Sequence, residues 1–128
     1  MKKKFLLLSF FLLSFTAFSQ EIKIDNDIVT IDGKPCLKIE GDANNVSFLD
    51  MDGNELFFLK FIHNSKYGRV YNKITFLDQK LTFTSQSYVF TKKLLIKKLL
   101  ADKTLVDCKL DPDKVERFVL KYDENIEK

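Results

Sequence analysis

Two cysteines and one histidine are the side chains of this 128-residue sequence best suited to covalent or acid–base chemistry. Cys36 and Cys108 are an even count, and two cysteines allow only one pairing. The sequence therefore predicts either a disulfide between them or two separate buried thiols, and spacing alone leaves both open. A bond would close a loop of about seventy residues and stabilise the fold by roughly 4 kcal/mol in the chain-entropy model.

His63 is the only histidine, which excludes a multi-histidine zinc site and leaves one imidazole as a general base. Paired with a cysteine thiol or a carboxylate, it would make the protein a small hydrolase. No catalytic signature surrounds Cys36 or Cys108, and His63 falls in an expected loop. We therefore interpret His63 as a solvated or hydrogen-bonded loop residue, predict no catalytic residue, cofactor or metal ligand, and keep the hydrolase as an alternative.

The run from Asp50 to Glu55 gathers several oxygen-bearing side chains around Gly53. A helix-loop-helix calcium site needs three alternating ligands before its glycine and a bidentate glutamate six residues after it. Here the glycine comes too early, and hydrophobic residues follow it. The Asp52-Gly53 pair instead predicts a β-hairpin turn.

Aromatic and lysine side chains are the candidates for an interaction surface. Tyrosine is enriched at binding hot spots, although a place in the core is the favoured interpretation for each of these rings. The lysines lie in a segment from Thr91 to Leu100 that resembles a basic amphipathic helix on an anionic membrane, although an ordinary packed helix with a solvated lysine face is the favoured interpretation. The candidate interface residues are Tyr67, Tyr71, Tyr88 and Phe57, and the candidate membrane-surface residues are Lys92, Lys93, Lys97 and Lys98.

A sheet must carry most of these residues, because the hydrophobic pattern has period two from Glu21 to about Phe90. Turn residues divide this stretch into hairpins, and the pattern predicts an antiparallel meander. One segment, 55–62, is apolar on both faces apart from Lys60, which predicts a central strand covered on two sides. The predicted hairpins pair 28–31 with 36–39, 46–51 with 55–62, and 69–77 with 81–84.

Two helices are predicted after the sheet. Thr91 can cap a helix that runs to about Ala101, and Asp111 can cap a second one with Pro112 at its first position. The segment 103–109 is either a loop or a short strand. The predicted fold is α+β: an antiparallel β-meander of about five to seven strands over residues 20–90, followed by two C-terminal helices over 91–128 that pack on one face.

The first 19 residues have the pattern of a secretory signal peptide, with three lysines, a long apolar run and a small-residue cleavage site near Ser19. Without those three lysines, 18 basic residues face 18 Asp and Glu, and only two of the basic residues are arginines. A neutral chain with two arginines argues against nucleic-acid binding. No later segment has the length of a transmembrane helix. We expect a single small domain, 20–128, that is periplasmic or secreted after cleavage.

These observations predict a small exported protein that is a non-enzymatic binding or interaction module of the cell envelope. Its partner would be another envelope protein or a surface ligand. The alternatives are the hydrolase that uses His63 and a membrane-surface binder that uses the lysine-rich helix 91–101.

Overall fold

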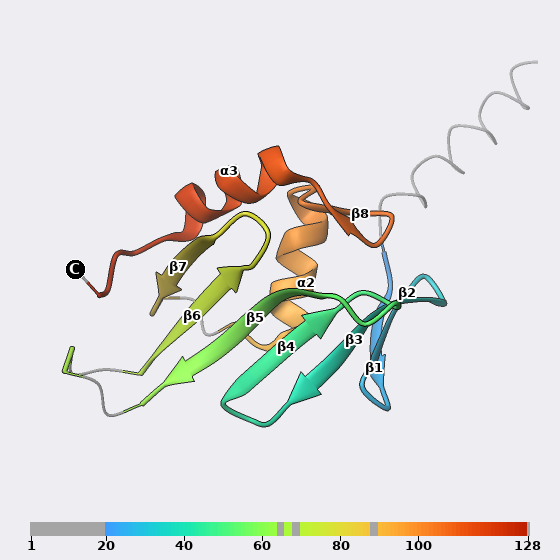
Figure 1. Cartoon of the computed structure of the whole chain (residues 1–128), viewed down its shortest axis with the longest axis horizontal. Helices are drawn as coiled ribbons and strands as arrows, with labels where there is room; N and C mark the ends of the chain where they lie inside the picture. The colour runs from blue at the N-terminus through green and yellow to red at the C-terminus, as the bar shows by residue number, and fades with distance from the viewer. Residues whose placement is uncertain (1–19, 64–65, 68–69, 88–89, 128) are drawn as a thin grey trace, which may run out of the picture.

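A computed structural model gives the arrangement of residues 20–63, 66–67, 70–87 and 90–127, which are the residues described below. Seven antiparallel strands pair in their order along the chain, which confirms the meander (Figure 1). The expected signal peptide and Tyr88 lie outside the described residues. The strands are β1 (Ile22–Asp25), β2 (Ile28–Ile31), β3 (Lys34–Gly41), β4 (Asn45–Leu49), β5 (Glu55–Ile62), β6 (Tyr71–Phe76) and β7 (Leu81–Ser85).

Tight turns join the strands where the sequence predicts them. Asp32 and Gly33 both have positive φ, 53° and 81°, as a two-residue hairpin turn requires. In the turn after β4, the Asp50 carboxylate accepts hydrogen bonds from the backbone N–H groups of Asp52 and Asn54, at 3.0 and 2.9 Å. The segment from Asp50 to Glu55 therefore forms a hydrogen-bonded hairpin turn, as predicted. Gly41 ends β3 with φ of 111°, and a Cβ atom there would collide with the carbonyl of Asn45.

Both predicted helices are present, and their capping residues are confirmed. Helix α2 (Lys92–Ala101) begins after Thr91, whose hydroxyl accepts from the N–H of Leu94 at 3.1 Å. Helix α3 (Pro112–Tyr122) begins after Asp111, whose carboxylate accepts from the N–H of Asp113 at 3.1 Å. Between the helices, β8 (Leu105–Val106) and β9 (Lys109–Leu110) form a small hairpin in the segment that the sequence left open between loop and strand.

The core lies between one face of the sheet and the two helices. Alternate residues of β3 to β7 face it, and the helices contribute their buried arcs to the same cluster. Rings are prominent in this core: Phe83 lies 5.7 Å from Phe118 and 5.9 Å from Phe90, measured between ring centroids. The residues from the helices are Leu95, Ile96 and Leu99 of α2 and Val115, Phe118, Val119 and Tyr122 of α3.

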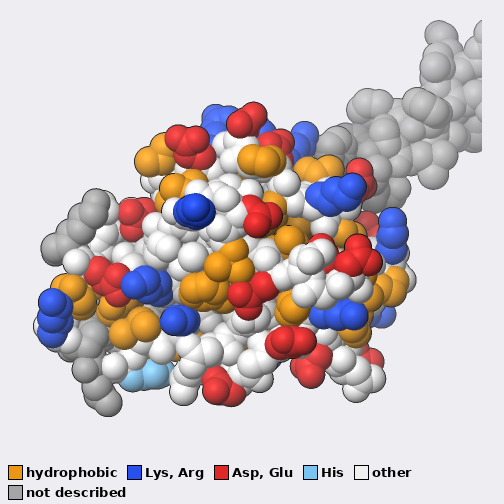
Figure 2. Space-filling view, viewed as in Figure 1, with side chains coloured by type: hydrophobic (Ala, Val, Ile, Leu, Met, Phe, Trp, Pro, Cys, Tyr) orange, Lys and Arg blue, Asp and Glu red, His pale blue; other side chains and the backbone are white. Residues whose placement is uncertain are grey.

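The prediction that the 55–62 strand is covered on both faces is wrong. Phe57 and Leu59 of β5 are fully buried, but Leu56 and Phe58 on the other face are only half-buried and Lys60 is exposed. Both helices pack against the inner face, so the outer face receives only local cover. For example, the Lys60 ammonium lies 5.2 Å from the centroid of the Phe58 ring. Figure 2 shows one view of the surface, in which hydrophobic side chains are interspersed with charged ones.

Candidate functional site

A cleft of about 910 Å³ lies between the first strands and the C-terminal end of α2. This volume is in the range of small-molecule sites, which is about 300–1,000 Å³. Its apolar wall combines side chains from the sheet, from α2 and from β8, next to the Cys36–Cys108 disulfide. These apolar residues are Ile22, Ile31, Leu100, Ala101, Leu105 and Val106.

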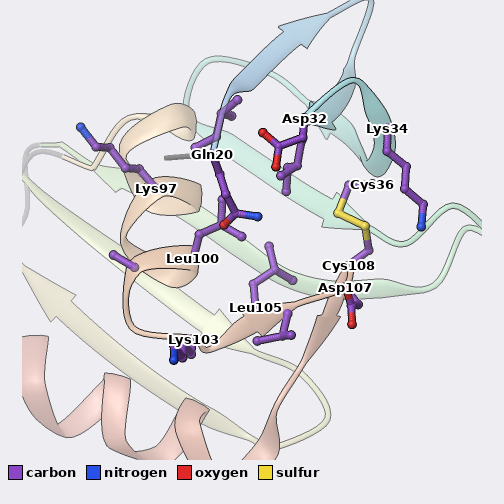
Figure 3. Close-up of a pocket in the computed structure, with 14 residues that line it drawn as sticks. Gln20, Asp32, Lys34, Cys36, Lys97, Leu100, Lys103, Leu105, Asp107 and Cys108 are labelled. Atoms are coloured by element: carbon purple, nitrogen blue, oxygen red, sulfur yellow. A yellow bond between two sulfur atoms is a disulfide. The ribbon is translucent and has the colours of Figure 1, made fainter. Parts of the chain in front are cut away.

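Charged side chains surround this apolar wall. Lys34, Lys97 and Lys103 are exposed and come from three different parts of the fold, namely β3, α2 and the turn that follows α2. Figure 3 shows Leu100 and Leu105 between α2 and the disulfide, with these lysines around the outside. Asp32 and Asp107 also line the cleft, so its fixed side-chain charge is one positive unit.

Hydrogen bonds between Glu21 and Asp32 fix the side of the cleft that the first two strands form. Asp32 bonds twice to Glu21: its backbone N–H donates to the Glu21 carbonyl, and its carboxylate accepts from the Glu21 N–H, both at 2.8 Å. The Asp32 carboxylate is therefore already engaged by the protein. Of the two acidic groups at the cleft, only Asp107 has no such backbone partner among the described contacts, and none of the three lysines forms an ion pair within the described part of the chain. The cleft is accordingly suited to an anion.

The opposite wall is fastened by the disulfide. The Cys36 and Cys108 sulfurs are bonded, and their Cα atoms are 5.2 Å apart. This result selects the disulfide over the two separate thiols that the sequence left open. Cys36 is fully buried in β3, whereas Cys108 lies in the β8–β9 turn, where Asp107 and Cys108 both have positive φ. The disulfide thus attaches the small hairpin to the sheet and fixes the position of Leu105.

His63 lies away from this cleft. Its Nε2 atom is 3.1 Å from the Oδ1 atom of Asn44, and its ring is exposed. Because both cysteine sulfurs are in the disulfide, no free thiol stands near His63 among the described residues. The arrangement matches the hydrogen-bonded loop histidine of the sequence interpretation.

The four candidate interface rings have different environments. Phe57 is not an interface anchor here, because it is fully buried and stacks on Phe48 with centroids 4.6 Å apart. Tyr71 is only 3% exposed, Tyr67 is half-buried, and the two rings form a T-shaped pair. Tyr88 is outside the described residues. The structure therefore brings two of the four, Tyr67 and Tyr71, to one place.

The candidate membrane-surface lysines lie on α2. Lys93 and Lys97 are exposed, and Lys92 and Lys98 are half-buried. The apolar arc of the same helix is buried in the core, so this arc cannot also insert into a lipid surface while the fold is intact. Only Lys97 of the four lines the cleft.

Sequence reasoning missed a polar cluster in which Tyr67 and Tyr71 take part. The segment after α3, Asp123–Glu127, turns back over the outer edge of β7, and we call it the C-terminal strap. Glu127 accepts a hydrogen bond from the Tyr71 hydroxyl at 2.6 Å and pairs with the Lys73 ammonium at 2.9 Å. Its backbone carbonyl accepts from the Tyr67 hydroxyl at 3.1 Å. Burial and the Glu127 carboxylate raise the pKa of Tyr71 to about 12.

The strap is expected to loosen in acid. Hydrogen bonds from Tyr71 and Lys73 lower the pKa of Glu127, with further help from the nearby positive charge of Lys66. Burial works to raise the pKa of Glu124, but hydrogen bonds from Gln86, Ser87 and Ser85 outweigh it, so this pKa is also lowered. A lowered folded-state pKa means that each carboxylate stabilises the attached strap above the ordinary glutamate value and stops doing so as pH falls through the lowered value.

An NMR pH titration of the backbone amides of Gln86 and Ser87 checks this expectation. Both should shift with a midpoint below about 4.3, the ordinary glutamate pKa, while the Ile74 amide inside the sheet stays constant. Midpoints at or above the ordinary value would contradict the arrangement of the strap.

Among the described residues, none of the helices has the length and apolar character needed to cross a membrane. The same residues contain no group of three or more His, Cys, Asp or Glu side chains placed to hold a metal ion. Comparison with known proteins gives no relative from which a role could be inferred: no family model, curated protein or solved structure matches the chain.

Proposed function

We propose that the protein is a non-enzymatic binding domain of the cell envelope, and that the cleft beside the Cys36–Cys108 disulfide is its ligand site. The observation that supports this proposal is the composition of the cleft: an apolar wall and a rim with three lysines, in a volume of about 910 Å³. An apolar wall with a few placed charges is typical of small-molecule sites. The ligand it fits is an amphipathic anion, with an apolar body against Leu100 and an acidic group near the lysines.

The disulfide supports the envelope location. Such bonds persist in oxidising compartments, including the periplasm and the exterior, and are rare in the cytosol. Here the bond also forms part of the cleft wall. A ligand site whose wall contains a disulfide is consistent with a protein that acts in an oxidising compartment, where the bond stays intact.

Titration with 1-anilinonaphthalene-8-sulfonate tests the cleft, because this dye combines apolar rings with one sulfonate and brightens when it leaves water. We expect saturable binding to the folded protein. The double charge reversal Lys97→Glu and Lys103→Glu should weaken binding by about tenfold or more, which corresponds to about 1.4 kcal/mol. Both lysines are exposed, so the fold should tolerate the change.

Two control variants separate the cleft from other dye sites. Lys93→Glu reverses one charge on the same helix, half the charge change of the cleft variant, one turn from Lys97 but outside the cleft. Leu120→Gln removes the most exposed large hydrophobic side chain, which is 76% exposed on α3. Neither should change the dissociation constant by more than about twofold, since isolated surface groups contribute little. Equal losses in the controls and in the cleft variant, or no saturable binding at all, would reject the cleft as the ligand site.

A further inference from the structure

The C-terminal strap pairs with the open edge of β7 as a ligand would. The Glu124 N–H donates to the Thr84 carbonyl at 2.8 Å, and the Thr84 N–H donates to the Asp123 carboxylate at 3.1 Å. Ile126 adds a third contact, because its N–H donates to the Thr84 hydroxyl at 2.9 Å. Both backbone groups of Thr84 therefore point away from β6 and are satisfied by the strap.

Beyond the edge, hydrogen-bond donors converge on two glutamates of the strap. The Glu124 carboxylate accepts from the Ser85 hydroxyl at 3.1 Å and from the N–H groups of Gln86 and Ser87 at 3.0 and 3.2 Å. Glu127 is held by the Tyr71 hydroxyl and the Lys73 ammonium, as described above. The surface under the strap thus presents donors and one positive charge to carboxylates.

Two of the four buried polar residues in the described part of the chain lie at this place. Thr84 is 5% exposed and Ser85 is fully buried, and both contact the strap. These groups are buried under the strap and hydrogen-bonded to it, and a hydrogen bond to a charged acceptor contributes about 1.5–3 kcal/mol. The strap itself is more open: Glu124 and Asn125 are exposed, and its one apolar residue, Ile126, is half-buried.

The strap also leaves part of the edge unused. In an antiparallel strand, alternate residues direct their backbone groups to the same side, so Thr82 faces outward like Thr84. Thr82 is exposed, and no strap residue bonds to its backbone. A longer extended segment could pair at both positions and still place carboxylates where Glu124 and Glu127 now lie.

We propose that the β7 edge, together with the donors of Ser85, Gln86, Ser87, Tyr71 and Lys73, is a binding site for an extended acidic segment of a partner protein. The strap occupies this site as an intramolecular ligand that the partner displaces. Adding a strand to an open edge is an established mode of peptide recognition, in which main-chain bonds give affinity and side-chain contacts give specificity. This site is separate from the cleft, so either proposal can fail without the other.

Peptide titration of a variant with a weakened strap tests the proposal. The double substitution Glu124→Gln and Glu127→Gln removes two of the three carboxylates of the strap, keeps Asp123 and does not shorten the chain. The probe is a synthetic peptide with the sequence of residues 122–127, blocked at both ends, and NMR follows the amides of Thr84, Gln86 and Ser87. We expect these amides to shift on titration and the affinity to be at least about tenfold higher than for the unaltered protein, because the intramolecular competitor is weaker.

Charge-matched controls make the result specific. Glu40→Gln with Glu116→Gln changes the net charge equally at two exposed glutamates outside the strap, and this variant should bind the peptide as weakly as the unaltered protein does. A peptide with glutamine at both glutamate positions should bind neither variant. If the strap variant is folded and its amides do not respond to millimolar peptide, the proposal is wrong. Self-association of the strap variant that the peptide does not reverse would also overturn it, in favour of pairing between two copies of the chain.

A competition experiment covers the case in which the strap variant does not fold. The unaltered protein is titrated with the same peptide to about 10 mM, above the millimolar effective concentration typical of a short tether. The Glu124 and Ile126 amides should then shift because the strap that carries them is released, whereas Gln86 and Ser87 keep the same kind of carboxylate partner in the bound peptide. No response at this concentration contradicts the proposal.

Discussion

Reduction of the Cys36–Cys108 disulfide is expected to lower the free energy of unfolding by about 4 kcal/mol. The bond joins residues 72 positions apart, so it removes a large loop-closure entropy from the unfolded chain. A small domain has a total stability of only about 5–15 kcal/mol, so this loss is a large part of it. The bond also connects β3 to the β8–β9 hairpin, which has few residues of its own to hold it in place.

Urea denaturation with and without a phosphine reductant measures this loss. The variant Cys36→Ala with Cys108→Ala should show the reduced stability in both conditions, because the reductant then has nothing to act on. Binding of the sulfonate dye should fall in parallel, since Leu105 and Val106 form one wall of the cleft and depend on the bond for their position. Stability that changes by less than about 1 kcal/mol on reduction would show that the hairpin is held by its packing instead.

Local features of the sequence predicted most of the secondary structure. Asp-Gly pairs define the turns after β2 and β4, and capping residues define the starts of α2 and α3. Each of these signals acts within a few residues, so it can be recognised in the sequence without knowledge of the rest of the fold. The extra hairpin of β8 and β9 was harder to predict, because two-residue strands have no hydrophobic period to detect.

The sequence of the 55–62 strand does not show which face of the sheet the helices cover. Phe58 and Leu56 are apolar enough to suggest cover on the outer face, yet the structure leaves them half-buried. An apolar side chain favours burial, but the tertiary packing determines which apolar side chains are in fact buried. The position of helix α3 on the sheet follows from the contact between its buried residues and β7, which only the tertiary structure shows.

The cleft and the strap could not be predicted, because each joins segments that are distant in the sequence. Glu127 meets Tyr71 across 56 positions, and Leu105 lines the cleft beside a disulfide that the sequence could not establish. The nearest signals were the acidic composition of 123–127 and the two tyrosines that the sequence marked as candidates. Only the tertiary fold shows that these belong together.

Phe83→Ala is expected to cost about 3–5 kcal/mol of unfolding free energy, the usual range for removing a buried phenylalanine. Phe83 is 1% exposed and is the ring that joins the sheet to both the α3 side chains and Phe90. Its centroid lies 5.7 Å from that of Phe118 and 6.5 Å from that of Tyr122. Removing the ring leaves a cavity that these neighbours can fill only by shifting. Both neighbours belong to α3, and the C-terminal strap follows that helix directly. The strap should therefore loosen too.

Phe58→Ala is the matched control, because it deletes the same side chain from the opposite face of the sheet. Phe58 is half-buried on a face that neither helix covers, so its removal should cost less than about half as much. Thermal and urea denaturation of the two variants measure the difference, and the Gln86 and Ser87 amides report the strap. If both substitutions cost the same, the outer face would be as well packed as the inner one, which would require a layer of protein over Phe58 that the described fold does not contain.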